Sequence, residues 1–233
     1  MPEINRTPDK PQSFGYKISW LAVKTTEPAA VIDTLGLVEA TPANWASGLA
    51  AVYETSPEGC WTFVSPPVDG WIFVVSRALP YPTVETQHNT GKDFDELFGG
   101  LMKRFEDVQF FGSYRVSGFC AWARALGGKL VRAYSYGDEL MMNFGDQTAE
   151  EADLGLVDLS GLSVFDAEAK LSSIAEVQME DQEQPDAHGR LFPDEADVVE
   201  LASFWSIDPT QLSEQDHPVG LGLVARLPEP PRR

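Results

Sequence analysis

Positive charge is scarce in this sequence of 233 residues, which carries 17 Lys and Arg residues against 36 Asp and Glu residues. The formal net charge at pH 7 is −19. A chain this acidic repels phosphate groups, so nucleic acids and anionic membranes are poor partners. Long apolar runs are also missing, since none approaches the roughly 18 residues that a membrane-spanning helix needs. The polar N-terminus MPEINRTPDKPQS lacks the features of a secretory signal, and we therefore expect a cytoplasmic protein.

Cysteine and histidine are scarce too, with two and three residues. Cys60 and Cys120 lie in strand-like apolar runs and are expected to be buried, reduced thiols. The histidines are far apart, lie in polar or Pro-bordered segments, and lack the spacing of metal ligands. We therefore expect no metal site, and we expect solvated side chains at His88, His188 and His217.

Common enzyme signatures are absent as well. The sequence contains no GxGxxG, GxxxxGK[ST], GxSxG or HExxH motif and no EF-hand loop. This favours a protein without catalytic activity or cofactor. A hydrolase that uses paired carboxylates such as Asp138 and Glu139 stays an alternative, although 36 acids provide such pairs by chance.

The negative charge is concentrated in one stretch. Residues 137–217 contain 21 acids and two bases, Lys170 and Arg190, whereas acids and bases balance in the rest of the chain. Such a concentration destabilises the fold through self-repulsion, and it commonly serves solubility or the steering of a basic partner. Part of it has a local explanation, because Thr148 and Glu151 have the spacing of a capping box at a helix start. Other acids in the first turns of that helix are stabilised by the positive end of the helix dipole.

The apolar spacing predicts an α+β fold, in which helices pack on a mainly antiparallel sheet within one compact domain. This domain is expected to span residues 15–228, after a flexible segment at 1–14 and before a tail at 229–233. Helices are expected at Pro28–Leu35, Asp93–Phe105, Thr148–Leu154 and Asp194–Trp205. Strands are expected at Gly15–Lys24, Gly48–Glu54, Gly59–Ser65, Gly70–Ser76 and Val219–Pro228, and in a hairpin at Arg115–Tyr136 that turns at Gly127-Gly128. An exposed loop is expected at Glu176–Asp194.

Several segments, taken in order, resemble cytosolic immunity proteins that partner secreted bacterial toxins, including type VI secretion effectors. They are TEPAAVIDTLGL, NWASGL, GWIFVVSRALP, FFGSYRVSGFCAWARALGGKLVRAYSYGDE, GDQTAEEADLGL and DEADVVELASFWSIDP. The resemblance covers the chain from Gly15 to about Leu227, and it is carried by turns and core aromatics. It implies an inhibitor without catalytic activity that binds one cognate toxin domain. Some immunity proteins instead act as enzymes that reverse the toxin's product.

Nuclease toxins must attract phosphate and so have basic clefts, which an acidic inhibitor complements. We therefore expect a toxin domain with a basic surface, that of a DNase, as the partner. The acids expected to bind it are Asp138, Glu139, Asp146, Glu150, Asp153, Glu180, Asp181, Glu183, Asp186 and Asp216. A carboxylate-dependent hydrolase and an acidic adaptor or scaffold are the alternatives.

Overall fold

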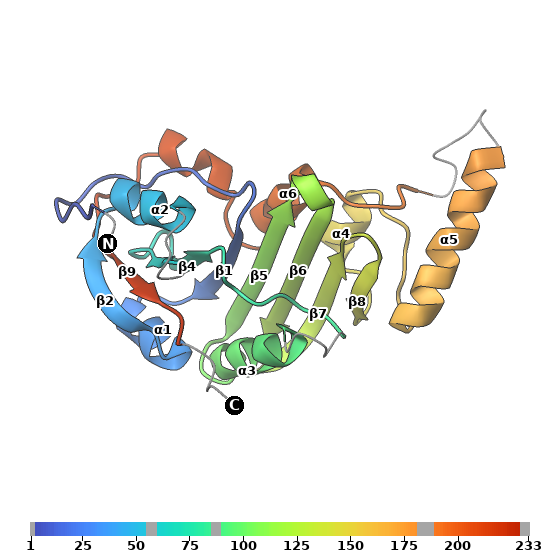
Figure 1. The fold of residues 1–233 in the computed structure, drawn as a ribbon, viewed down its shortest axis with the longest axis horizontal. Helices are drawn as coiled ribbons and strands as arrows, with labels where there is room; N and C mark the ends of the chain where they lie inside the picture. Colours follow the sequence, from blue (N-terminus) through green and yellow to red (C-terminus); the bar gives the residue numbers. More distant parts are fainter. Residues whose placement is uncertain (1–2, 55–59, 85–89, 181–188, 229–233) are drawn as a thin grey trace.

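The structure is a computed structural model that describes residues 3–54, 60–84, 90–180 and 189–228, with only the backbone described at 90–92 and 179–180. Nine strands of these residues form one sheet in the order β2-β9-β3-β4-β1-β5-β6-β7-β8 (Figure 1). All neighbouring strands are antiparallel, and helices lie on both faces of the sheet. The predicted α+β fold is confirmed. No helix of the described ranges is long and apolar enough to cross a bilayer.

The strands are β1 Ser19–Lys24, β2 Val38–Ala43, β3 Thr62–Val64, β4 Trp71–Ser76, β5 Asp107–Tyr114, β6 Phe119–Leu126, β7 Lys129–Tyr136, β8 Leu140–Phe144 and β9 Gly222–Arg226. The helices are α1 Pro28–Leu35, α2 Trp45–Tyr53, α3 Thr90–Met102, α4 Ala149–Asp153, α5 Val164–Glu180 and α6 Glu195–Trp205, with short 3-10 helices η1 at Arg115–Ser117 and η2 at Pro209–Glu214.

The sheet has a hydrophobic core on each face, because successive residues of a strand point to opposite sides. In β1, Trp20 belongs to one core and Leu21 to the other. The first core lies under α2, α6, η2 and part of α5, and the second lies under α1, α3 and residues 77–84. Both sides of the central strands are therefore buried.

Local signals account for the elements that were predicted correctly. The capping boxes of α4 and α6 form as expected, with Thr148 and Asp194 as the N-cap residues. The hairpin β6–β7 turns at Gly127 and Gly128, which both have positive φ angles. Two glycines adopt this turn without the steric strain that a side chain would add.

The strand predicted at Gly48–Glu54 is wrong, because this segment belongs to α2. Asn44 caps the helix by accepting a hydrogen bond from the Ser47 amide at 3.0 Å. Asp9 accepts bonds from the next two amides, those of Trp45 at 2.7 Å and Ala46 at 3.0 Å. The first four amide groups of an α-helix have no acceptor within the helix. Here the carboxylate of Asp9, which is distant in sequence, accepts from two of them. Sequence spacing alone gave no sign of this contact.

The segment expected to be a loop at Glu176–Asp194 begins inside a helix, since α5 continues to Glu180. Residues 181–188 lie outside the described residues. The prediction missed α5 because only a narrow stripe of it is apolar and buried, at Ala167 and Leu171. A helix that buries little of its surface has a weak sequence periodicity.

The N-terminal segment contacts the domain over its described part. Phe14 is buried in the first core, where its ring packs edge-on against Trp20 and Phe73. The amide of Gly220, near β9, donates to the carbonyl of Asp9 at 2.9 Å. The segment thus closes the core beside α2 and η2.

We predict opposite effects for the same substitution at two helical glycines. A Cβ at Gly48 would lie 2.2 Å from the ring of Phe63, whereas a Cβ at Gly99 in α3 would meet no atom within 4 Å. Gly48→Ala should lower the free energy of unfolding by about 1–3 kcal/mol through overpacking. Gly99→Ala should raise it by about 0.5–1 kcal/mol. Urea unfolding of both variants checks this, and equal shifts would contradict the packing of α2 on β3.

Candidate functional site

Negative charge gathers at one edge of the sheet. Residues 137–180 contain eleven acids and a single base, Lys170. They form the β7–β8 turn, the edge strand β8, α4 and α5, which we call the acidic edge. In Figure 1 this edge lies on the right, where α5 projects beside β8. The chain therefore has a local excess of negative charge at this edge.

Most of the predicted toxin-binding acids belong to this edge. Five of them have side chains at its surface: Asp138, Glu139, Asp146, Glu150 and Asp153. Glu180 ends α5, and its side chain is not described. Asp181, Glu183 and Asp186 lie outside the described residues.

Asp216 does not join this group. It lies between η2 and β9, and β9 is next to β2 at the opposite edge of the sheet. Lys10 of the N-terminal segment donates to Asp216 Oδ1 at 2.8 Å, and this hydrogen bond holds the pKa of Asp216 below its usual value. Asp216 therefore lies away from the described candidates of the acidic edge.

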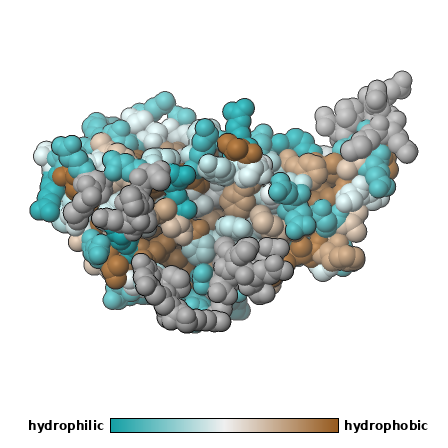
Figure 2. Space-filling model, viewed as in Figure 1, coloured by the Kyte–Doolittle hydropathy of each residue, from teal (hydrophilic) through white to brown (hydrophobic). Residues whose placement is uncertain are grey.

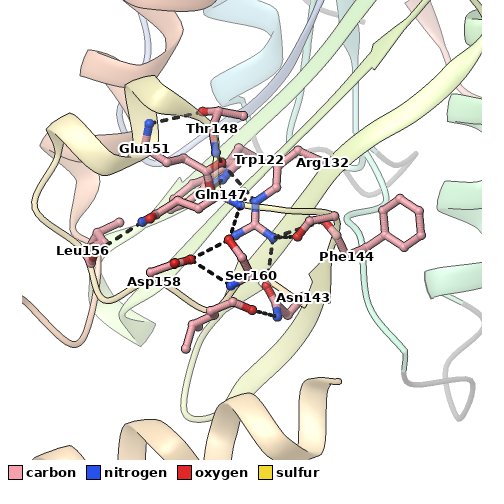
Figure 3. Close-up of polar contacts among 12 residues, drawn as sticks. Trp122, Arg132, Asn143, Phe144, Gln147, Thr148, Glu151, Leu156, Asp158 and Ser160 are labelled. Carbon is pink, nitrogen blue, oxygen red and sulfur yellow. Dashed lines mark hydrogen bonds and ion pairs between the residues drawn. The ribbon is translucent and has the colours of Figure 1, made fainter. Parts of the chain in front are cut away.

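A buried ion pair fastens the acidic edge to the sheet (Figure 3). Arg132 of β7 donates from Nε to Glu151 Oε1 at 2.8 Å, and the two side chains are 3% and 1% exposed. Trp122 of β6 donates to the same oxygen at 2.8 Å. Glu151 also completes the α4 capping box by accepting from the Thr148 amide at 2.9 Å. The acid that the sequence marked as structural thus bonds to three groups at once.

The guanidinium of Arg132 also holds the end of β8. Its Nη1 donates to Asn143 Oδ1 at 2.8 Å and to the carbonyl oxygens of Phe144 and Gly145 at 3.1 Å each. Asn143 Nδ2 in turn donates to the carbonyls of Leu159 and Leu162, both at 3.0 Å. The network therefore joins β7, β8 and the two connections on either side of α4. Arg132 was not among the predicted site residues, although its position two and four residues before Tyr134 and Tyr136, on the core-facing side of β7, was a signal for it.

Two further contacts occupy backbone groups of β8. Glu168 of α5 accepts from the Leu140 amide at 3.0 Å. The Val84 amide donates to the Met141 carbonyl at 3.0 Å. Both groups would otherwise be open to pairing with another strand.

Aromatic side chains lie beside the acids. Tyr136, at the end of β7, stacks on Phe192 with ring centroids 4.7 Å apart. Partial burial raises the pKa of Tyr136, and the negative charges of Glu168 and Asp138 raise it further. Apolar side chains also gather on the face in Figure 2 where the start of α5 lies near β8. The exposed phenylalanines of these elements are Phe144, at 48% exposure, and Phe165, at 82%.

A pocket of about 390 Å³ lies between η1, at the tip of the β5–β6 hairpin, and the start of α6. Tyr16 contributes aromatic surface to its lining, and Asp194 and Glu195 contribute carboxylates. The ring of Phe119 packs on Tyr81 in the second core, on the other face of the sheet. Cys120 also lines it and pairs with Tyr136 across β6 and β7. The pocket is therefore next to the Tyr136–Phe192 stack and borders the acidic edge.

Two side chains differ from their predicted environments. Cys60 is exposed, because it precedes β3 and does not belong to it. His217 is buried at 7% exposure, with Nδ1 3.8 Å from Asp69 Oδ2, since the chain after η2 folds back against the first core's strands. Cys120 is buried as expected, whereas His88 and His188 lie outside the described residues. In the ranges described, no three His, Cys, Asp or Glu side chains are placed to hold a metal ion.

No family model, curated protein or solved structure matches the chain.

We predict that loss of Arg132 strongly destabilises the fold. Arg132→Met leaves the Glu151 carboxylate buried without its cation, which typically costs about 3–5 kcal/mol. Arg104→Met is the control, since it breaks the exposed Arg104–Asp33 pair and should cost at most about 1 kcal/mol. Urea unfolding measures both. Similar losses in the two variants would show that the buried pair contributes no more than a surface pair.

The two thiols should differ sharply in reactivity. Burial raises the pKa of Cys120 to about 12, with further contributions from Asp197, Asp194 and Glu195, so its thiolate is almost absent at pH 8. A thiol reagent such as Ellman's reagent should titrate one fast cysteine in the native protein and two after unfolding. Cys60→Ser should remove the fast reaction. A fast thiol that persists in this variant would contradict the burial of Cys120.

Proposed function

We propose that this protein is an immunity protein that binds and neutralises a cognate secreted toxin, with a basic nuclease domain as its target. The observation that carries the proposal is the acidic edge, with eleven acids against one base on one side of the sheet. A nuclease cleft must be basic to hold phosphate, and an acidic surface is its electrostatic complement. The inhibitor needs no chemistry of its own in this account.

The acids of the edge suit the steering of a partner. Asp146, Asp153 and Glu176 are exposed and form no ion pair with the described residues. Their field is therefore not cancelled locally, and it extends about 8–10 Å at physiological salt. Fields of this kind raise association rates by roughly 10 to 1,000 fold.

Exposed phenylalanines supply the contacts that would slow dissociation. Phe165 is 82% exposed in the first turn of α5, and Phe144 is 48% exposed at the end of β8. Large aromatic side chains surrounded by polar groups are frequent centres of binding energy in protein interfaces. An acidic surface with aromatic anchors thus fits a protein partner better than a small substrate.

The hydrolase alternative gains no support from the positions of Asp138 and Glu139. Both are exposed in the β7–β8 turn, and neither lines the pocket beside it. Of the carboxylates that do line the pocket, Asp194 accepts hydrogen bonds from the Ala196 and Asp197 amides as the cap of α6. A paired-carboxylate mechanism needs two acids that both face a substrate.

The test is charge reversal on the acidic edge, measured against a basic nuclease domain that co-purifies with the protein. Changing Asp146, Asp153 and Glu176 to Lys should slow association about tenfold or more at low salt. The effect should shrink as salt rises, and the dissociation rate should change less. The matched control changes Glu54, Asp95 and Glu106 to Lys, which alters the net charge equally on surfaces away from this edge.

Equal slowing of association by the two triple variants would show that only net charge matters. That result would contradict a specific role of the acidic edge. Co-expression separates an inhibitor from an adaptor. An immunity protein restores growth to cells that produce the toxin. The variant with Asp146, Asp153 and Glu176 changed to Lys should restore it less well. Binding without rescue of growth would favour the adaptor or scaffold.

A further inference from the structure

The second face of the sheet carries exposed apolar side chains at the acidic edge. In β8, Met142 is opposite Ser135 and Phe144 is opposite Ala133, and opposite residues of antiparallel strands point to the same side. Because Ala133 belongs to the second core, Phe144 lies on that face. Figure 3 shows its ring turned away from the Arg132 network. Phe144 is 48% exposed, so the cover over the second core ends before the end of this strand.

Two neighbouring elements extend this apolar surface. Val84, whose amide donates to the Met141 carbonyl, is 56% exposed. Phe165 in the first turn of α5 is 82% exposed. The start of α5 lies beside the end of β8, since Asn143 Nδ2 donates to the Leu162 carbonyl at 3.0 Å. Apolar side chains gather there in Figure 2. The members of this surface, which we call the apolar corner, are Val84, Met142, Phe144 and Phe165.

The surroundings of the apolar corner are acidic. Residues 137–169, which contain β8, α4 and the start of α5, hold nine acids and no Lys or Arg. Asp146 follows Phe144 by two positions, and Asp166 follows Phe165 directly; both acids are exposed. A second copy of this chain would bring like charges together, which is unfavourable. The apolar corner therefore fits another protein whose apolar side chains are flanked by Lys or Arg.

The backbone of β8 restricts how that protein docks. Strand addition needs a row of free amide and carbonyl groups along an edge strand. Glu168 accepts from the Leu140 amide, and Val84 donates to the Met141 carbonyl. The Phe144 carbonyl also accepts a hydrogen bond. Because a regular ladder cannot form here, the docking element has to present side chains, and an amphipathic helix presents an apolar stripe flanked by charge.

We infer that the apolar corner receives an amphipathic basic helix of the partner protein. Its large apolar side chains would pack on Phe144 and Phe165, and its Lys or Arg side chains would face the surrounding acids. The inference rests on the proposed function, because it states which element of a basic toxin the acidic edge would hold. Helices that bind other proteins in this way have apolar residues at positions i, i+3, i+4 and i+7.

The experiment measures binding of a designed peptide to the full chain by isothermal titration calorimetry. The peptide has about 18 residues, with Leu at the spacing of one helix face and Lys elsewhere. The matched peptide has the same composition in an order that spreads the leucines over all sides. We expect it to bind at least about tenfold more weakly. A central Pro, which breaks a helix, should weaken binding of the amphipathic peptide about tenfold as well. Glu in place of every Lys should abolish binding.

Variants of this protein locate the bound peptide. Phe144→Ser and Phe165→Ser should each weaken binding about tenfold, since each removes a large apolar contact. Phe204→Ser in α6 is the matched control, because Phe204 is 47% exposed, and it should leave binding unchanged. If Phe144→Ser disturbs the fold, Phe165→Ser alone decides, because a side chain with 82% exposure contributes little to the core.

Equal affinity for the two Lys peptides, or for peptides with and without the central Pro, would overturn the amphipathic helix as the occupant. Tight binding of the Glu peptide would overturn its basic character, and unchanged binding by Phe165→Ser would overturn the apolar corner. Dimers in sedimentation that Phe165→Ser removes would make a second copy the occupant instead. The titration needs no toxin. A negative result therefore counts against this mode of docking, whereas failure of the charge-reversal experiment counts against the proposed function.

Discussion

The ion pair between Arg132 and Glu151 is the contact on which the acidic edge depends. Eleven acids along one stretch of chain repel one another, and only Lys170 within that stretch carries a positive charge. Arg132 brings a second cation from the neighbouring strand and places it inside the structure, where little water screens it. The guanidinium then binds the helix start through Glu151 and the end of β8 through two carbonyls. One side chain thus keeps together a segment whose surface charges push it apart.

The acids of this chain divide into two groups with different work. Glu151, Glu168, Asp194 and Asp197 satisfy backbone amides or pair with a cation, and they are part of the fold. Asp197, for example, accepts a hydrogen bond from the Asp194 amide and also pairs with Arg190. The hydrogen bond between Asp197 and Arg190 raises the pKa of Arg190. The described exposed acids of α4 and α5 neither accept from backbone amides nor pair with a cation. A net charge of −19 is therefore the sum of a structural set and a surface set, and only the second is available to a partner.

Sequence reasoning succeeded where a signal was local and failed where it was not. The capping box at Thr148 and the Gly127-Gly128 turn each involve residues within four positions, and both formed as predicted. The helix α2 was misread as a strand although Asn44 caps it locally, and the further capping by Asp9, 36 positions away, had no signal in the sequence. The partner of Glu151 was missed for the same reason, since Arg132 reaches it only through the register of β7. The described candidate acids lie on one edge because they follow one another along the chain, except Asp216, whose position depends on the return of β9 beside β2.

The two outer strands of the sheet have a consequence for how this protein meets other chains. At one end, β2 contains Pro42, which has no amide hydrogen, and its pairing with β9 is irregular between Val38 and Thr41. At the other end, Glu168, Val84 and Arg132 already engage backbone groups of β8. Neither strand offers a regular row of donors and acceptors to a newcomer. Crowded copies should therefore resist joining sheet to sheet into fibrous aggregates, and any protein partner has to recognise side chains, whose identity differs from one protein to another.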